Sequence, residues 1–152
     1  DGAALVLVAE EEYARGRGWP VWARVVDAQV AAADYTTGKE DLLLAPTRAI
    51  PKLLERNGLT LADFDFLEIH EAFASTVLAT IKALEANGVG TVDRSKLNVK
   101  GSSLAAGHPF AATGGRIVAS LAKMLHERGP GSRGLVSICA AGGQGVVAIL
   151  EA

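Results

Sequence analysis

The sequence has little cysteine, few aromatic residues and no excess of basic charge. Its one cysteine, Cys139, excludes an internal disulfide and fits a reducing compartment. The 15 basic residues are outnumbered by 17 acidic ones, which argues against nucleic-acid binding because phosphate-reading surfaces usually carry a basic excess. Glycines interrupt the apolar run at 135–150, so no stretch reaches the roughly 18 residues of a membrane span.

No positively charged start followed by an apolar core marks a signal peptide, so we expect a cytoplasmic protein. A chain of 152 residues with 49% hydrophobic residues is long enough for one ordinary core, which favours a single domain. Residues 3–9 are apolar without interruption, as in a strand buried on both faces of a sheet. We therefore expect the chain to be a fragment that begins inside the core of a larger protein.

Hydrophobic periodicity predicts alternating strands and helices, and hence an α/β fold with helices packed on a layered sheet. Its functional edge is expected where strands end and helices start. The last two strands are joined too closely for a crossover, so we expect an antiparallel hairpin. The predicted strands cover 3–9, 21–35, 63–69, 98–100, 135–139 and 146–151. The predicted helices cover 10–17, 48–56, 70–85 and 109–128, with a loop at 101–107. In the last helix, a buried stripe is expected from Ile117, Leu121, Met124 and Leu125.

His108 is the strongest single candidate for chemistry. Gly107 before it permits a tight turn, and Pro109 after it suits the first position of a helix whose unpaired N–H groups lie near the imidazole. A ring so placed can bind an anion or accept a proton. The residues leave open that His108 only caps the helix.

Metal and dinucleotide sites find less support. His70-Glu71 resembles the start of a zinc-protease motif, but position 74 is alanine, so the second ligand is absent and we predict no metal site. Residues 129–134 match G-x-G-x-x-G, yet they follow a helix and precede a strand, the reverse of the dinucleotide-binding order. We interpret that segment as an ordinary loop.

Cys139 ends an apolar run and is followed by a glycine-rich turn. A lone cysteine is more often a buried core thiol than a catalyst. The following glycines favour chemistry, because they allow backbone amides, including that of Ala141, to point into a cavity where an oxyanion forms during acyl transfer.

Four motifs occur in a fixed order: His-Glu-Ala-Phe-Ala at 70–74, Asn-Val-Lys-Gly at 98–101, a Gly-His-Pro segment at 107–116, and Cys-Ala-Ala-Gly-Gly-Gln-Gly at 139–145. Together they resemble the C-terminal half of thiolases, which cleave 3-ketoacyl-CoA with coenzyme A or condense two acyl-CoA molecules. The resemblance implies a mixed five-stranded sheet with helices on both faces over residues 21–152. It also implies that residues 1–20 hold the last strand and a short helix of the family's N-terminal half.

The resemblance assigns roles to individual residues. His108 looks like the imidazole that activates a nucleophilic cysteine and helps to hold the substrate thioester oxygen, with the amide of Ala141 as the other part of an oxyanion hole. Cys139 looks like the second family cysteine, which exchanges protons with the substrate. His70 stands where many thiolases have an asparagine that holds a catalytic water, and histidine there resembles the branch that degrades longer fatty acyl chains, including the β subunits of fatty-acid oxidation complexes. Substrate contacts are expected from Phe73 and Phe110.

The resemblance also shows what is absent. The family's nucleophilic cysteine and most of its coenzyme A contacts belong to the N-terminal half, so we expect this chain alone to be inactive. Acyl-CoA and CoA are implied as substrates, with no other cofactor, and a homo-oligomer is implied as the assembly. Two alternatives remain: a non-catalytic module that binds acyl groups or supports an assembly, and a Cys-His hydrolase with Cys139 as nucleophile, for which no orienting Asp or Asn is found.

Overall fold

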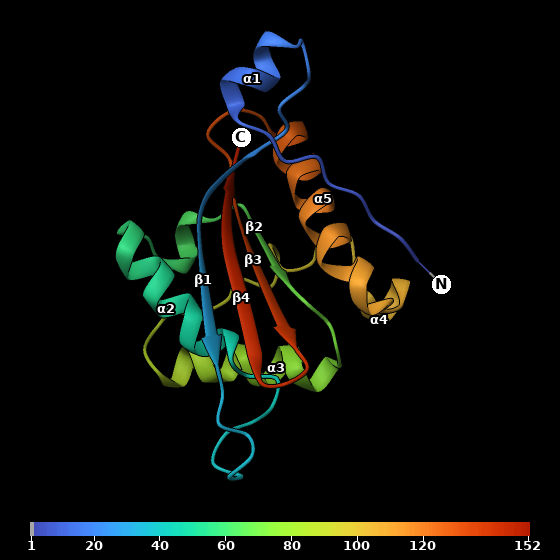
Figure 1. Cartoon of the computed structure of the whole chain (residues 1–152). Coiled ribbons are helices and arrows are strands. Elements are labelled where there is room, and N and C mark those ends of the chain that lie inside the picture. Colours follow the sequence, from blue (N-terminus) through green and yellow to red (C-terminus); the bar gives the residue numbers. More distant parts are fainter. Residues whose placement is uncertain (1) are drawn as a thin grey trace.

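A computed structural model describes residues 2–152 and shows a four-stranded sheet with helices on both faces (Figure 1). The α/β class and the layered arrangement are therefore confirmed, but the predicted sheet of five strands has four. The elements are α1 (Glu11–Gly16), β1 (Arg24–Ala32), α2 (Pro46–Asn57), η1 (Leu61–Asp63), β2 (Phe66–Ile69), α3 (Ala74–Ala86), α4 (Ser103–Ala106), α5 (Phe110–Arg128), β3 (Arg133–Ala140) and β4 (Gln144–Glu151).

The sheet has the strand order β1-β4-β3-β2 and is mixed. Strand β4 pairs antiparallel with β1 and with β3, which confirms the predicted C-terminal hairpin, whereas β2 pairs parallel with β3. The register of β1 shifts between Val25 and Asp27, where a bulge interrupts the ladder. Because β2 and β3 are parallel, their carboxyl ends lie at the same edge of the sheet.

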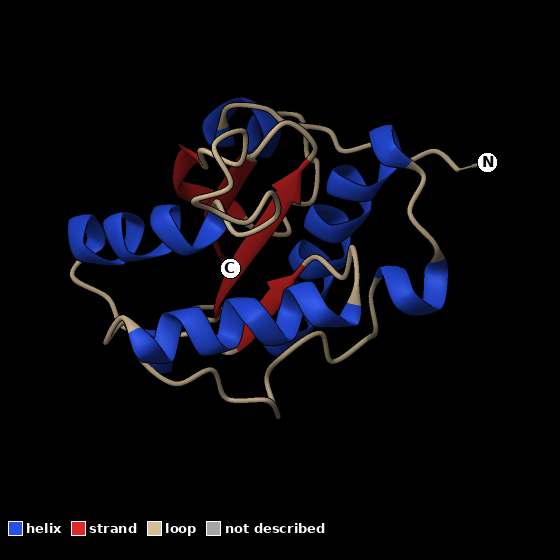
Figure 2. Ribbon diagram, turned by 90° about the horizontal axis from the view of Figure 1, so that it is seen from below, coloured by secondary structure: helices blue, strands red, loops and turns tan. Residues whose placement is uncertain are grey.

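Alternating side chains of the strands supply two cores, one on each face of the sheet. Leu135 of β3 packs with α2 and α3, whereas Val136, the next residue, packs with α5. Figure 2, viewed from below, shows the strands between these helices. The buried stripe of α5 has the predicted members Ile117, Leu121, Met124 and Leu125. No helix within residues 2–152 combines the length and the apolar character that crossing a membrane requires.

The predicted helix bounds hold best where a glycine ends the helix. Gly58 closes α2 in the left-handed conformation, with φ of 63°. Helix α3 begins at Ala74 instead of residue 70, because Phe73 before it is extended. The His70 N–H bonds the Ser137 carbonyl and so prolongs the pairing of β2 with β3. The predicted loop at 101–107 contains the short helix α4.

Strands β1 and β2 are shorter than predicted, and the strand predicted at 98–100 is missing. Strand β2 begins at Phe66, because a capping box of Thr60 and Asp63 winds Leu61–Asp63 into a 3₁₀ turn. The strand predicted at 98–100 was the fifth of the sheet, and the structure replaces it by a turn. What remains is one parallel bridge between Leu67 and Leu97.

Residues 2–10 have no regular secondary structure in this chain. The strand at 3–9, which the resemblance assigns to the N-terminal half, therefore stays a prediction. The segment runs beside α5 (Figure 1), where Ala4 lies close to Gly115 and Gly2 close to Pro109. Leu5 is 95% exposed, so the apolar run is not a core strand within the described residues. A strand needs a hydrogen-bonding neighbour, and none of the described strands lies beside this one.

Candidate active site

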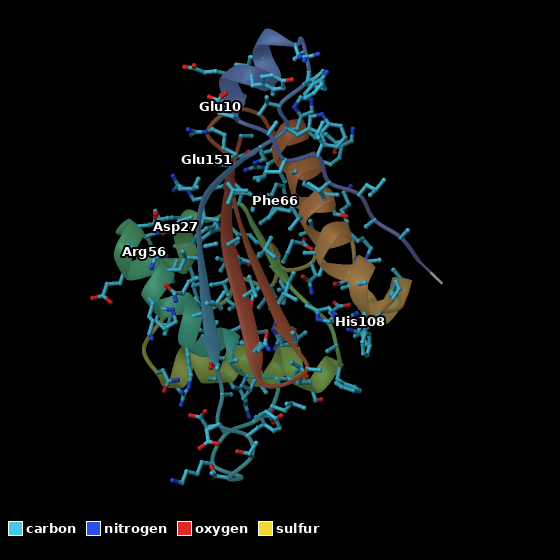
Figure 3. The ribbon with its side chains drawn as sticks, in the orientation of Figure 1. Glu10, Asp27, Arg56, Phe66, His108 and Glu151 are labelled. Carbon is cyan, nitrogen blue, oxygen red and sulfur yellow. The ribbon has the colours of Figure 1, made fainter. Side chains whose placement is uncertain are left out.

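Three segments that are distant in the sequence meet at the carboxyl edge of β2 and β3. His70 follows β2, and Cys139 lies near the end of β3. His108, which is labelled in Figure 3, occupies the turn between α4 and α5. The ring centroids of His70 and His108 are 4.4 Å apart. The Cys139 sulfur lies 3.8 Å from Nδ1 of His70. The structure thus brings together all three predicted catalytic side chains.

His108 is held by a residue that the sequence analysis missed. Its Nδ1 lies 2.7 Å from Oγ1 of Thr113, and the Thr113 hydroxyl in turn donates to the Pro109 carbonyl at 3.1 Å. With the hydroxyl proton directed to that carbonyl, Nδ1 is the donor of the His108–Thr113 hydrogen bond. In this arrangement a neutral His108 carries its proton on Nδ1 and keeps the lone pair of Nε2 free to accept another.

A weak sequence signal marks Thr113. The residue stands five positions after the histidine, on the first turns of α5, and its side chain is buried. A hydroxyl at that place reaches back over the helix start, where side chains point towards the N-terminus. The helix itself begins at Phe110, one residue later than predicted, with Pro109 as its extended N-cap.

His70 is buried and electrically neutral. Only 1% of its surface is exposed, and Nε2 has no hydrogen-bond partner among the described residues. Burial lowers the pKa of His70, and the neighbouring His108 lowers it further. The ring is thus a neutral group with one nitrogen towards the Cys139 thiol and the other free to bind a ligand atom or water.

Cys139 is 7% exposed, and burial raises the pKa of its thiol. At neutral pH the group is a thiol and not a thiolate. It therefore suits proton donation better than unassisted nucleophilic attack, for which the thiolate is required.

The turn after Cys139 needs glycine for two reasons. Gly142 and Gly143 have φ of 88° and 71°, a conformation that other residues rarely adopt. A Cβ on Gly145 would lie 2.5 Å from the backbone nitrogen of Pro46, so the start of β4 just after the turn packs directly against the start of α2. Ala141, at the beginning of this turn, is exposed and lies outside the left-handed region, so alanine imposes no strain there.

Two exposed aromatic residues border the site. Phe110 is 81% exposed, and its ring centroid lies 4.7 Å from that of His108. Phe73 is also exposed and precedes α3, three residues after His70. The structure brings the Phe110 ring against that of His108, whereas Phe73, at the start of α3, makes no ring contact with either histidine among the described residues.

Glu68 is a second residue that the sequence analysis missed. It is 3% exposed on β2, and its Oε1 has no hydrogen-bond partner among residues 2–152. Burial raises its pKa to about 7, an effect that Arg116 partly offsets and Glu71 strengthens. An acidic residue within the otherwise apolar strand Phe66–Ile69 is the sequence signal that points to it.

The fold and the site define an α/β protein with a cluster of one cysteine and two histidines at the carboxyl edge of its sheet. Residues 20–152 match the family model described as "Thiolase, C-terminal domain". The chain belongs to the thiolase family, as the four motifs predicted.

Similar proteins support this assignment. The bovine mitochondrial trifunctional enzyme subunit beta is 43% identical over 163 residues, which cover 100% of this chain and 34% of that protein. A 3-ketoacyl-CoA thiolase of Yersinia pestis is 41% identical over 162 residues, covering 99% of this chain and 36% of that protein.

Solved structures agree. The acetyl-CoA acetyltransferase of Bacillus anthracis superposes with a TM-score of 0.79 at 40% identity, over 93% of this chain and 33% of that one. Human mitochondrial 3-ketoacyl-CoA thiolase superposes with a TM-score of 0.80 at 34% identity, over 95% of this chain and 34% of that one. This chain therefore spans about a third of the length of these relatives.

Proposed function

We propose that this chain supplies the acid/base part of an acyl-CoA acyltransferase active site. The reaction is thiolytic cleavage of 3-ketoacyl-CoA with CoA, or the reverse condensation. The observation that carries the proposal is the meeting of His70, His108 and Cys139 at one edge of the sheet. Relatives named 3-ketoacyl-CoA thiolase, one of them solved in complex with CoA, support the substrate class, with CoA a substrate and no other cofactor.

In this proposal His108 is the base. Its free Nε2 takes the proton of a nucleophilic cysteine, and the cysteine attacks the 3-keto carbon of the substrate. The carbon–carbon bond next to that carbon then breaks, and Cys139 donates a proton to the α-carbon of the departing acetyl-CoA. Cys139 afterwards takes the proton of the incoming CoA thiol, which attacks the acyl group and releases the shortened acyl-CoA. The nucleophilic cysteine leaves as a thiolate, and His108 returns to it the proton that it took in the first step. The proton count of both cysteines is thereby restored.

His70 and the oxyanion groups stabilise the charge that develops on oxygen. The Nε2 of His70 has no partner among the described residues and is free to bind a water or the substrate oxygen. The Ala141 amide and His108 form the proposed oxyanion hole. Phe110, exposed beside His108, and Phe73, exposed after His70, are the proposed substrate contacts.

The acyl-accepting nucleophile must come from outside the chain. Cys139 is the single cysteine, and it is buried as a neutral thiol. His108 and Phe110 are exposed, which leaves one side of the site open to a covering N-terminal half. We propose that residues 1–20 belong to that half and 21–152 to the C-terminal domain, and that the chain alone is inactive.

The cellular setting follows the same reasoning. The single buried cysteine supports a reducing compartment and hence a cytoplasmic location, although the bovine relative is named mitochondrial. A homo-oligomer is proposed because the yeast peroxisomal thiolase is described as dimeric. Histidine at position 70 and the resemblance to the trifunctional enzyme subunit favour fatty acyl degradation as the direction.

A chimera tests the proposed roles. Residues 2–152 replace the aligned third of the Yersinia 3-ketoacyl-CoA thiolase, and thiolysis of acetoacetyl-CoA is measured. We expect turnover, with a loss of about three powers of ten or more in His108→Ala and a comparable loss in Cys139→Ser, since a hydroxyl is a far weaker acid than a thiol. His126→Ala, remote from the site beside Trp22, is the matched control and should stay active. An inactive chimera that folds contradicts the proposal and favours a non-catalytic acyl-binding module. Activity that survives His108→Ala contradicts the role of His108 as the base.

A further inference from the structure

Asn98 takes over the role of the missing fifth strand with its side chain. Its backbone has φ of 46°, and it is the one residue other than glycine among 2–152 with a positive φ. Its Oδ1 accepts the Ile69 N–H at 2.9 Å, while its Nδ2 donates to the Ile69 carbonyl at 2.8 Å. The amide therefore pairs with both backbone groups of the residue immediately before His70.

Glu71, the residue immediately after His70, extends this pairing to the loop that carries His108. Its Oε1 accepts the second Nδ2 proton of Asn98 at 3.0 Å. Its Oε2 accepts the backbone N–H of Leu104 in α4 at 3.2 Å. Helix α4 has no side-chain cap of its own from Ser102, so the Glu71 carboxylate supplies one from a different segment.

Helix α4 is also fixed on its other side. Arg116 of α5 donates from Nη2 to Oγ of Ser103 at 2.9 Å. The helix ends at Ala106, and His108 follows after one glycine of φ 81°. A short helix tied to α5 and to Glu71 therefore leaves little freedom for the position of His108.

We propose that Asn98 and Glu71 are positioning residues that set the spacing between the His70 and His108 rings. We refer to these two residues as the Asn98–Glu71 clamp. It bonds the chain on both sides of His70 and reaches α4 just before His108, so both rings depend on it. Among the described residues, neither side chain has a hydrogen bond to the Cys139 thiol or to a ring nitrogen. Their hydrogen bonds reach the backbone at Ile69 and Leu104, through which they act on the rings.

The clamp requires an amide at 98 and a carboxylate at 71. An asparagine offers one acceptor and two donors, and all are used, whereas a carboxylate offers two acceptors, and both are used. Glu71→Gln presents an N–H₂ group to either the Asn98 N–H₂ or the Leu104 N–H, so one hydrogen bond is lost and two donors face each other. Asn98→Asp removes both donors and places a second carboxylate against Glu71.

The test is proton NMR of the 15.7 kDa chain, which holds only three histidines. We expect a nuclear Overhauser cross-peak between the His70 and His108 rings in the wild type, given their 4.4 Å separation. This cross-peak should be lost in Glu71→Gln and in Asn98→Asp, and it should return in part in the double variant, where an amide and a carboxylate again face each other. Glu85→Gln, the same chemical change at an exposed position of α3, should leave it unchanged.

Folding is checked independently through His126 and Trp22, whose rings stack 5.9 Å apart far from the clamp. Loss of the His70–His108 cross-peak while the His126–Trp22 cross-peak persists supports positioning. Asn98→Gly, which keeps the positive φ, is the second variant if Asn98→Asp unfolds. An inter-ring cross-peak that survives in folded Glu71→Gln and Asn98→Gly overturns the proposal. The effect of the Asn98–Glu71 clamp on turnover rests on the proposed function. The NMR test of ring spacing does not, so it can succeed or fail independently of the chimera assay.

Discussion

Glu68→Gln is expected to stabilise the chain in a strongly pH-dependent way. Glu68 is a buried residue of β2, and its Oε1 has no hydrogen-bond partner among the described residues. Its ordinary pKa of 4.5 is raised to about 7, mainly by burial. Glutamine has nearly the same shape and stays neutral, so the variant removes the charge and little else.

The sign follows from proton binding. Between pH 4.5 and about 7 the unfolded chain has lost the Glu68 proton while the folded chain retains it. The unfolded state binds fewer protons in this window, so stability falls as pH rises. One pKa unit corresponds to about 1.36 kcal/mol, so this shift makes the free energy of unfolding about 3 kcal/mol larger below pH 4.5 than above pH 7.

Urea unfolding followed by circular dichroism measures this directly at pH 5 and pH 8. The free energy of unfolding of Glu68→Gln minus that of the wild type should rise by about 2–3 kcal/mol from pH 5 to pH 8. Comparing the two proteins cancels the opposite contribution of His70, whose lowered pKa makes stability rise with pH. Glu85→Gln is the exposed control and should give a difference that does not change with pH. A Glu68→Gln advantage that is constant, or that shrinks towards pH 8, refutes the reasoning.

Three further predictions concern the Cys139 thiol, the glycine turn and the N-terminal segment. Iodoacetamide at pH 8 should alkylate Cys139 at least about tenfold more slowly in the native chain than in urea, because the thiol is buried and its pKa is raised. Mass spectrometry measures both rates, and equal rates would contradict this. Gly145→Ala should cost about 1–3 kcal/mol in urea unfolding, because its Cβ meets the backbone of α2, whereas Gly16→Ala, with nothing within 4 Å, should be neutral or stabilising. Deleting residues 1–17 should shift an associating chain towards monomer in light scattering, since that deletion removes the exposed apolar run at 3–9; an unchanged mass would be evidence against association through this segment.

Sequence periodicity predicted the elements that depend on local pattern. The stripe of α5 and the β3–β4 hairpin need only regular spacing and short connections, and both are confirmed. The strand at 3–9 stays a prediction, because an apolar run indicates burial without identifying the strand that it pairs with. The strand at 98–100 failed because the Asn98 side chain does what a strand backbone would do, and periodicity does not register such a replacement.

The site was predictable to a similar extent. His70, His108 and Cys139 carry motif signals, and the structure places them together. Thr113 was missed because its role depends on a side chain that folds back over the helix start. Glu71 was noted only as a neighbour of His70, since its partners Asn98 and Leu104 lie 27 and 33 residues away in the sequence.

The central claim is that Cys139 moves protons while the acyl-accepting cysteine lies outside this chain. Incubation of the purified chain with acetyl-CoA, followed by intact mass spectrometry, tests it most directly. We predict no acetyl adduct, and no thiolysis of acetoacetyl-CoA in the same sample once host thiolase has been removed, because Cys139 is a buried neutral thiol. An acetyl group on Cys139, or turnover by the chain alone, would contradict the account and make Cys139 the nucleophile.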